Sequence, residues 1–207
     1  MEITWFGRNC FRIRGREGAI VTDPCPPESG YKFAKPAADV VTLSRKDDGG
    51  YNAVAVVGGS PRVLDAPGEY EIGGILVTGV ATKGLDGERN VAFVIEVDGI
   101  RVGHLGLLGS APGAAAIAAM GDIDVLLIPT GGVNALTPRL AQDLMTSIDP
   151  VIAIPMNFKT DVEVLELVPL AEFQKETGAK PEPLARLQVS KGTLPSELTV
   201  MVLEPRS

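Results

Sequence analysis

The sequence predicts an α/β protein of the α+β type, in which two β-sheets are sandwiched between helices in an αββα arrangement. In the first half of the 207-residue chain, short apolar segments alternate with tight-turn signals, whereas in the second half apolar residues recur at helical spacing. The continuous apolar runs 125–128 and 151–154 are typical of strands that are buried on both faces. Together these patterns favour a layered sandwich.

Short strands and hairpin turns are expected in the first half. Residues 3–6, 11–14 and 19–22 are strand-like segments, punctuated by the turn signals Gly15 and Gly18. Gly73-Gly74 joins segments 70–72 and 75–81, and Asp98-Gly99 joins segments 91–97 and 100–102. Both dipeptides suit the positive φ angles of a two-residue hairpin turn. We therefore expect antiparallel pairing in this half of the chain.

Helices are expected in the second half. The clearest one begins after Thr137, a suitable N-cap residue, with Pro138 at the first helical position. Its apolar face consists of Leu140, Ala141, Leu144, Met145 and Ile148. Segments 112–120 and 168–177 predict two further helices, the second of which ends at Gly178. Segments 184–189 and 198–203 predict two final strands.

Composition and charge limit the class of protein. With 45% hydrophobic and 22% charged residues, the chain is expected to fold as one domain over residues 1–207. Its 26 acidic and 19 basic residues give a net charge of -7, which disfavours nucleic acids and anionic membranes as partners. No stretch approaches the roughly 20 apolar residues that span a bilayer, and the first residues predict a strand rather than a signal peptide. We expect a cytoplasmic protein.

Four segments, in a fixed order, point to a known family. They are residues 1–11 with 19–24, residues 38–44, residues 100–109, and residues 124–132 with 154–158. Together they resemble the small metallo-β-lactamase-fold hydrolases, in the branch related to ascorbate-6-phosphate lactonase. The resemblance covers residues 1 to 160, approximately three quarters of the chain. It implies a metallo-β-lactamase-like fold with zinc at the centre of the catalytic site.

The metal-binding motif of that family is altered here. In the family, a strand that ends in Thr or Ser is followed by His-x-His-x-Asp-His, whereas Ser44 is followed by Arg-Lys-Asp-Asp-Gly-Gly. The aspartate and the histidine that the family has further along the chain are also replaced, and one more histidine is expected near Lys83 or Gly84. The positions that the resemblance identifies as former ligands are Arg45, Asp47, Gly49, Gly50, Leu107 and Asn157.

These replacements predict that a zinc site cannot form. Zinc is bound by Cys, His and carboxylate side chains, with about three protein ligands in a catalytic site. Of the residues at these positions, only Asp47 could ligate well and Asn157 weakly. Magnesium needs fewer protein ligands, but Arg8, Arg45 and Lys46 would place positive charge in the same region. No metal cofactor is therefore expected.

Charged residues could replace the metal electrostatically. The resemblance places Arg8 where the family has a histidine, and Arg8 and Arg45 could face Asp23, Asp47 or Asp48. The alternative is that these charges point to water, as most do. If one of these cations had no carboxylate partner, a small anion could bind to the group formed by Arg8, Arg45, Lys46 and Lys159. The candidate pocket residues are Arg8, Asp23, Arg45, Lys46, Asp47, Asp48 and Asn157.

Other chemistries find little support. The glycines between Gly103 and Gly109 lack the G-x-G-x-x-G spacing of a dinucleotide-binding turn. His104 is the only histidine, and it is expected to pack in the core rather than act as a base. Cys10 is expected to pack beside the pocket, although a disulfide with Cys25 stays open.

Three functional hypotheses remain. The first is a pseudoenzyme, a non-catalytic relative of the hydrolases that serves as a binding, regulatory or assembly protein, with a small anion or a protein as its partner and with homo-oligomerisation as an option. The second is a metal-dependent hydrolase of a phosphoester or lactone that uses Asp47, Asp48 and Asn157. The third is a metal-free enzyme that uses His104 or Cys10.

Overall fold

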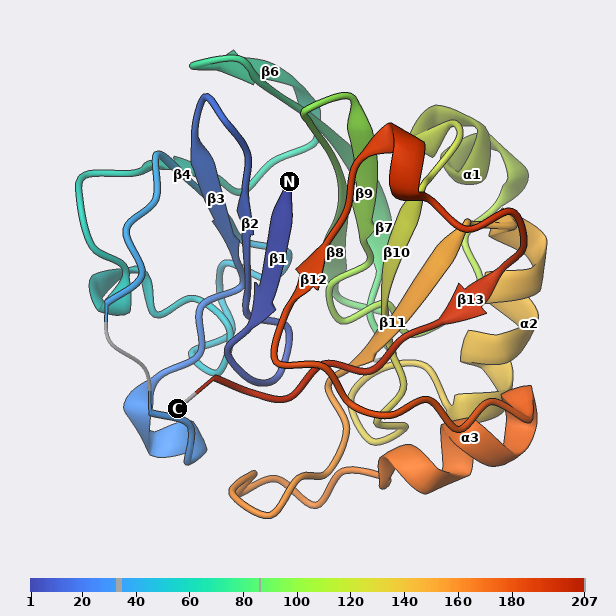
Figure 1. Ribbon diagram of the computed structural model, residues 1–207. Coiled ribbons are helices and arrows are strands. Elements are labelled where there is room, and N and C mark those ends of the chain that lie inside the picture. The colour runs from blue at the N-terminus through green and yellow to red at the C-terminus, as the bar shows by residue number, and fades with distance from the viewer. Residues whose placement is uncertain (33–34, 86, 207) are drawn as a thin grey trace.

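Two β-sheets packed face to face form the centre of the computed structural model, which describes residues 1–32, 35–85 and 87–206 (Figure 1). Within these residues, the first sheet has the strand order β12-β1-β2-β3-β4-β5. Its strands are β1 (Glu2–Trp5), β2 (Phe11–Arg14), β3 (Ala19–Thr22), β4 (Val40–Thr42), β5 (Arg62–Leu64) and β12 (Leu187–Gln188). β1, β2 and β3 pair antiparallel, which confirms the predicted strands, while β4 and β5 add in parallel.

The second sheet has the order β13-β11-β10-β9-β8-β7-β6. Its strands are β6 (Gly68–Ile72), β7 (Ile75–Lys83), β8 (Arg89–Val97), β9 (Ile100–His104), β10 (Val125–Pro129), β11 (Ile152–Met156) and β13 (Thr199–Val200). Both predicted hairpins are present, and Gly73-Gly74 and Asp98-Gly99 have the positive φ angles that such turns require. β10 pairs in parallel with β9 and β11. All residues of β10 and β11 are buried, as the two continuous apolar runs predicted.

The helices lie on the outer side of the second sheet (Figure 1). They are α1 (Ala114–Met120), α2 (Pro138–Ile148) and α3 (Leu170–Thr177). The Thr137 hydroxyl caps α2 by accepting a hydrogen bond from the backbone N–H of Leu140 at 3.3 Å. Loops with the single turns η1 (Pro27–Ser29) and η2 (Val54–Val56) cover part of the outer side of the first sheet. No helix among the described residues is long and apolar enough to cross a membrane.

The predicted C-terminal strands are shorter than expected. Segment 184–189 contributes only the two residues of β12, and segment 198–203 contributes only the two residues of β13. Between these strands the chain forms the turn η3 (Lys191–Thr193). Leu184 instead forms an isolated bridge with Leu203. The chain therefore leaves the first sheet after Gln188 and joins the second at Thr199, and it adds only a short edge strand to each sheet.

The main core lies between the sheets. Along β2, Phe11 and Ile13 are buried in this core, whereas Arg12 and Arg14 alternate onto the outer face. A second apolar cluster joins α1, α2 and α3 to the outer face of the helix-covered sheet. Burial of this apolar surface is the main stabilising contribution to the fold, and it holds rigid the strand ends from which the candidate site is built.

Candidate functional site

The site that the sequence singled out lies at one end of the sandwich, where five loops meet. These loops follow β1, β4, β9, β10 and β11 at the carboxyl ends of the strands (Figure 1). Contacts between the loops are short: the backbone N–H of Asn157 donates to the carbonyl of Arg8 at 3.2 Å, and the N–H of Leu136 donates to the carbonyl of Leu108 at 2.8 Å. Residues distant in sequence are thus held in one place.

Arg8 forms a buried ion pair with Glu163. The guanidinium Nε lies 3.3 and 3.1 Å from the two carboxylate oxygens of Glu163, and Nη2 lies 2.9 Å from Oε1. A further donor, Nη1, bonds to the carbonyl of Gly50 at 3.2 Å. The side chains of Arg8 and Glu163 are 5% and 0% exposed. The charge of each is therefore neutralised inside the protein.

Tyr51 stands against this ion pair. The guanidinium carbon of Arg8 lies 5.6 Å from the centre of the Tyr51 ring, within the range of a cation–π contact. Burial raises the pKa of Tyr51 well above its ordinary value, so the phenol is neutral at physiological pH. Tyr51, Leu107 and Ala135 form a small buried apolar cluster.

A closed ring of three hydrogen bonds joins Tyr51, Asn134 and Asn157. The Tyr51 hydroxyl donates to Asn157 Oδ1 at 2.9 Å, Asn157 Nδ2 donates to Asn134 Oδ1 at 2.9 Å, and Asn134 Nδ2 donates back to the Tyr51 hydroxyl at 2.7 Å. Asn157 is fully buried. Its carbonyl also approaches Gly131 so closely that a Cβ at that position would lie 2.0 Å from it.

The 44–50 loop, where the resemblance expected the metal-binding motif, lies at the surface. Lys46, Asp47 and Gly49 are exposed, and Arg45, Asp48 and Gly50 are partly buried. Lys46 pairs with Asp65 at 3.6 Å, and Asp48 Oδ1 accepts the N–H of Gly50 at 3.0 Å. A polar pocket of about 400 Å³ opens here. Its lining residues are Ser44, Arg45, Lys46, Asp47, Asp48, Gly49, Asp65, Glu88 and Arg89.

Asp23 lies beneath this loop and is fully buried. Its Oδ1 accepts the backbone N–H of Ser44 at 2.6 Å, and its Oδ2 accepts a long hydrogen bond from Asn9 at 3.4 Å. Burial raises the pKa of Asp23 to about 7, although the N–H of Ser44 opposes this effect. Asp23 therefore anchors the start of the 44–50 loop.

Arg8 follows neither of the two alternatives that the sequence left open. It pairs with none of Asp23, Asp47 and Asp48, and it does not point to water: within the described part of the chain its carboxylate partner is Glu163. Asp23 is instead satisfied by Ser44 and Asn9. The other candidate cation, Lys159, is also engaged, because its Nζ donates to the carbonyls of Glu163 and Leu165 and to Glu166.

His104 and the cysteines belong to the core. His104 is fully buried, its Nε2 lies 2.9 Å from the carbonyl of Asn9, and burial lowers its pKa to about 4. A neutral ring that donates through Nε2 fits this carbonyl partner. Cys10 and Cys25 are both buried free thiols, so the disulfide that the sequence left open is absent. The pKa of the Cys10 thiol is raised, mainly by burial, which disfavours a reactive thiolate.

The backbone is strained where the loops meet. Of the described non-glycine residues, five have positive φ, and three of these are Arg8 (46°), Asp23 (36°) and Asn157 (54°). The other two, Asp98 and Asp149, lie in a hairpin turn and at a helix end. Such strain persists only where surrounding contacts hold it, and it is common at functional sites.

Comparison with known proteins identifies the family. The model of the family described as beta-lactamase superfamily domain matches residues 2–157 of this chain. The chain belongs to the beta-lactamase superfamily. This assignment confirms the predicted metallo-β-lactamase resemblance and its fold class.

Of three similar proteins, two carry names that refer to metals. A structure from Thermotoga maritima, assigned as a Zn-dependent hydrolase of the metallo-beta-lactamase superfamily, is 36% identical, with a TM-score of 0.84 over 98% of this chain and 97% of that one. A UPF0173 protein of Pyrococcus furiosus is 29% identical in an alignment 196 positions long, which covers 85% of this chain and 90% of the relative. A UPF0173 metal-dependent hydrolase of Methanoregula boonei is 26% identical over 77% and 83% of the two chains.

The side chains present do not fit the zinc site of the superfamily. Within residues 1–32, 35–85 and 87–206, no group of three or more His, Cys, Asp or Glu side chains is arranged to hold a metal ion. Asp47 is exposed, whereas the amide of Asn157 is buried and bonded to Tyr51 and Asn134. The donor set is therefore too small, and it is divided between the surface and the interior.

Three residues of the site were missed by the sequence analysis. Glu163, Tyr51 and Asn134 belong to no motif that is recognisable in this chain. Tyr51 directly follows the altered motif, which was the one available signal. Glu163 lies between Val162 and Val164 in a loop after β11, and no sequence pattern there distinguishes it from a solvated acid.

Proposed function

We propose that this protein is a non-catalytic member of the superfamily that acts as a binding, regulatory or assembly protein. The observation that supports this proposal is the buried network around Arg8. Among the positions where the superfamily motif has ligands, the interior ones hold Leu107 and Asn157, and the space beside them is occupied by Tyr51 and the ion pair of Arg8 with Glu163.

The first argument for the proposal is the charge of the buried Arg8–Glu163 pair. A guanidinium is always protonated in proteins, so Arg8 contributes a permanent positive charge to the site. Glu163 neutralises this charge at 2.9 Å. A metal ion that entered the same space would meet a cation, and it would have to compete with Arg8 for the buried carboxylate. Because the two buried charges already satisfy one another, the network is complete without an ion.

The second argument for the proposal is that the polar groups of Tyr51 and Asn157 already have hydrogen-bond partners. In the Tyr51, Asn134 and Asn157 ring, the hydroxyl both donates and accepts, and Asn157 uses both its amide oxygen and its amide nitrogen. Withdrawing Asn157 Oδ1 to ligate a metal would leave the Tyr51 hydroxyl without an acceptor. An unsatisfied buried polar group costs about 1–3 kcal/mol, so the ring opposes metal binding.

Any ligand of this end of the molecule would then bind in the surface pocket. Arg8 and Lys159 have their donors engaged inside the protein, which weakens the predicted anion site in the interior. The pocket of about 400 Å³ that Arg45, Lys46 and Arg89 line together with Asp47 and Asp48 is the remaining candidate. Its mixed charge suits a partner that presents both signs, as a protein surface does.

The names of the relatives favour the second candidate, a metal-dependent hydrolase of a phosphoester or lactone with unconventional ligands. The UPF0173 hydrolase of Methanoregula boonei and the Thermotoga maritima structure are both described as metal-dependent. In this chain such a site would have to use Asp47 and Asp48 in the surface loop. The two candidates make opposite predictions for metal content.

A measurement of bound metal distinguishes the non-catalytic protein from the metal-dependent hydrolase. The purified protein is incubated with zinc, manganese, iron or magnesium, passed through a desalting column, and analysed for bound metal and for the change in melting temperature. We expect no stoichiometric metal and no ion-specific stabilisation, since an ion that bound only the folded state would raise stability. Stoichiometric metal that an Asp47→Ala variant no longer binds would overturn the proposal and establish the metal-dependent candidate.

A further inference from the structure

A cluster of arginines lies on the outer face of the first sheet, away from the α1, α2 and α3 layer. Arg12 and Arg14 are two residues apart on β2 and share this face, so their Cα atoms are about 7 Å apart. Arg12 pairs in register with Thr4 and Val21, and Arg14 pairs with Glu2 and Ala19. In a chain with a net charge of -7, neighbouring cations on an open sheet face require an explanation.

Among the described residues, neither arginine forms an ion pair with a carboxylate. The Nε of Arg12 donates to the carbonyl of Ala37 at 3.1 Å, which orients the guanidinium and leaves its two terminal nitrogens available. In the part of the chain that the structure describes, no hydrogen bond or ion pair engages the side chain of Arg14. Glu2 lies opposite Arg14 in register, but its carboxylate pairs with Arg186 at 3.1 Å and with Gln188 at 3.4 Å.

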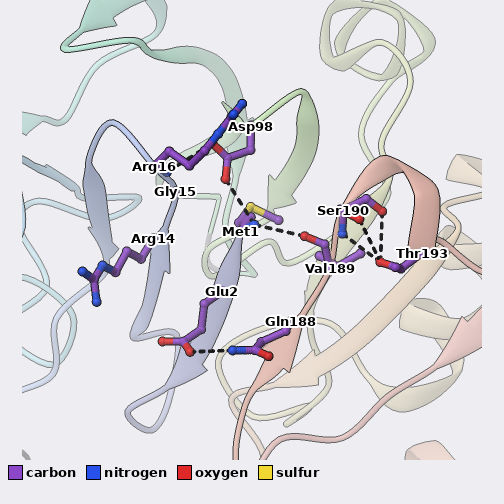
Figure 2. Close-up of a pocket in the computed structure, with 10 residues that line it drawn as sticks. All are labelled: Met1, Glu2, Arg14, Gly15, Arg16, Asp98, Gln188, Val189, Ser190 and Thr193. Carbon is purple, nitrogen blue, oxygen red and sulfur yellow. Dashed lines mark hydrogen bonds and ion pairs between the residues drawn. The ribbon is translucent and has the colours of Figure 1, made fainter.

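Figure 2 shows the contrast with the neighbouring pocket. There the Met1 amino group and Arg16 both pair with Asp98, at 3.2 and 3.4 Å, and Ser190 bonds to Thr193. Arg14 also lines this pocket, but its guanidinium points away from these groups, toward the other side of the β-hairpin. The Met1, Arg16 and Asp98 groups are paired with one another, whereas Arg14 takes part in none of these bonds.

A groove of about 630 Å³ lies on that other side, and both Arg12 and Arg14 line it. Its size falls in the range of about 300–1,000 Å³ that is typical of small-molecule sites. The groove also contains two acids, Glu17 and Asp39. The carboxylate of Asp39 already accepts the backbone N–H of Ala19 at 2.9 Å. Burial is the largest effect on the pKa of Arg12 and lowers it. The charges of Arg14 and Arg206 also lower this pKa, whereas the carboxylates of Glu2 and Asp39 raise it. An anion that bridged the two guanidiniums would offset the repulsion between Arg12 and Arg14.

We propose that this groove binds a small polyanion, a molecule with two or more neighbouring phosphate or carboxylate groups, through the guanidinium groups of Arg12 and Arg14. Each guanidinium can chelate one oxyanion group with two parallel N–H bonds, and two arginines that share one face of β2 suit two linked groups better than one. The proposal does not rest on the proposed function, because no residue of the Arg8 network lines this groove.

The test uses tripolyphosphate and citrate as probes, with sodium chloride at matched ionic strength as the blank. Binding is measured by calorimetry and by the shift in melting temperature. We expect one of the two anions to bind and stabilise the protein, and its identity distinguishes a phosphate ligand from a carboxylate ligand. In an Arg12→Gln/Arg14→Gln variant we expect the affinity to fall at least about tenfold, because charge-assisted contacts are lost. No binding of either probe would refute the site.

A matched variant separates a specific site from general electrostatics. Arg139→Gln/Lys175→Gln removes two positive charges from α2 and α3, where both side chains are exposed, and it should keep the affinity of the wild type. Equal losses in the two double variants would contradict the proposal. The single variant Arg14→Gln guards against misfolding, since its side chain has no partner to lose. Without ligand, it should be at least as stable as the wild type and should bind the probe more weakly.

Discussion

Arg8 and Glu163 are 155 positions apart in sequence, yet their side chains form a buried ion pair with three nitrogen–oxygen contacts of 2.9–3.3 Å. The first residue lies in the turn after β1, and the second lies in the loop after β11. The pair therefore ties the two sheets together at the end of the sandwich where the superfamily has its metal site. Each charge is stabilised mainly by the other, because both side chains are buried away from water.

Removing one partner of this pair should be costly, and removing both should be much less so. Arg8→Met leaves Glu163 as an unpaired buried carboxylate, and breaking such a pair costs about 3–5 kcal/mol. The double variant Arg8→Met/Glu163→Leu should recover most of this loss because no isolated charge remains. Urea unfolding of the wild type, the two single variants and the double variant measures the coupling. Additive effects of the two substitutions would show that the side chains do not form a pair in solution.

The hydrogen-bonded ring makes a second prediction. Tyr51→Phe removes one hydroxyl but leaves both Asn157 Oδ1 and Asn134 Nδ2 without their partners. We expect the free energy of unfolding to fall by about 1–3 kcal/mol, as for other unsatisfied buried groups. Tyr70→Phe is the matched control, since the Tyr70 hydroxyl makes one hydrogen bond, to the carbonyl of Ala66, in a partly exposed place. An equal, small effect in both variants would contradict a closed ring.

Asp23 predicts a pH dependence of stability. Its pKa is raised from 3.8 to about 7 in the folded protein, so between these values the folded state holds a proton that the unfolded state has released. Stability due to this group is present below pH 3.8 and is lost as the pH rises toward 7. Asp23→Asn should remove this loss while its amide oxygen still accepts the N–H of Ser44. Chemical unfolding at pH 5 and pH 8 should show the variant gaining on the wild type at the higher pH. A constant difference between the two proteins would exclude titration of Asp23 in this range.

Substitutions at two glycines, Gly131 and Gly49, test the close contact between Gly131 and the backbone of Asn157. At Gly131 an added Cβ would lie 2.0 Å from the carbonyl of Asn157, whereas at Gly49 nothing lies within 4 Å. We expect Gly131→Ala to destabilise the protein by about 1–3 kcal/mol, as overpacking of a close-packed site does. Gly49→Ala should stay within about 0.5 kcal/mol of the wild type, as is usual at the surface. Thermal unfolding of the two variants gives the comparison, and a tolerated Gly131→Ala would mean that the loops after β10 and β11 lie further apart.

Local signals allowed most of the fold to be predicted. The turns at Gly73-Gly74 and Asp98-Gly99 and the cap at Thr137 depend only on nearby residues, and all three are present. The C-terminal strands were predicted too long because their length depends on which sheet edge each can reach. Nothing within segments 184–189 and 198–203 specifies that choice.

The site was only partly predictable for the same physical reason. The altered positions could be found from the motif, but the partner of Arg8 could not, since a buried acid and a solvated acid look alike in sequence. Asp23 was one of three carboxylates considered as partners of Arg8. The structure shows instead that both oxygens of Asp23 accept hydrogen bonds, from Ser44 and Asn9.

The late pairing of β12 with β1 has a consequence for synthesis on the ribosome. Glu2 of β1 pairs with Gln188 of β12, and Thr199 of β13 pairs with Ile152 at the border of the other sheet. At translation rates of about 5–20 residues per second, β1 waits on the order of ten seconds or more for its neighbour to be made. During that time the backbone N–H and C=O groups on the edge of β1 that faces away from β2 remain open to pairing with another chain. Protection of the nascent N-terminal strand by a chaperone should therefore matter more for this protein than for one whose first strand is paired on both sides by early residues.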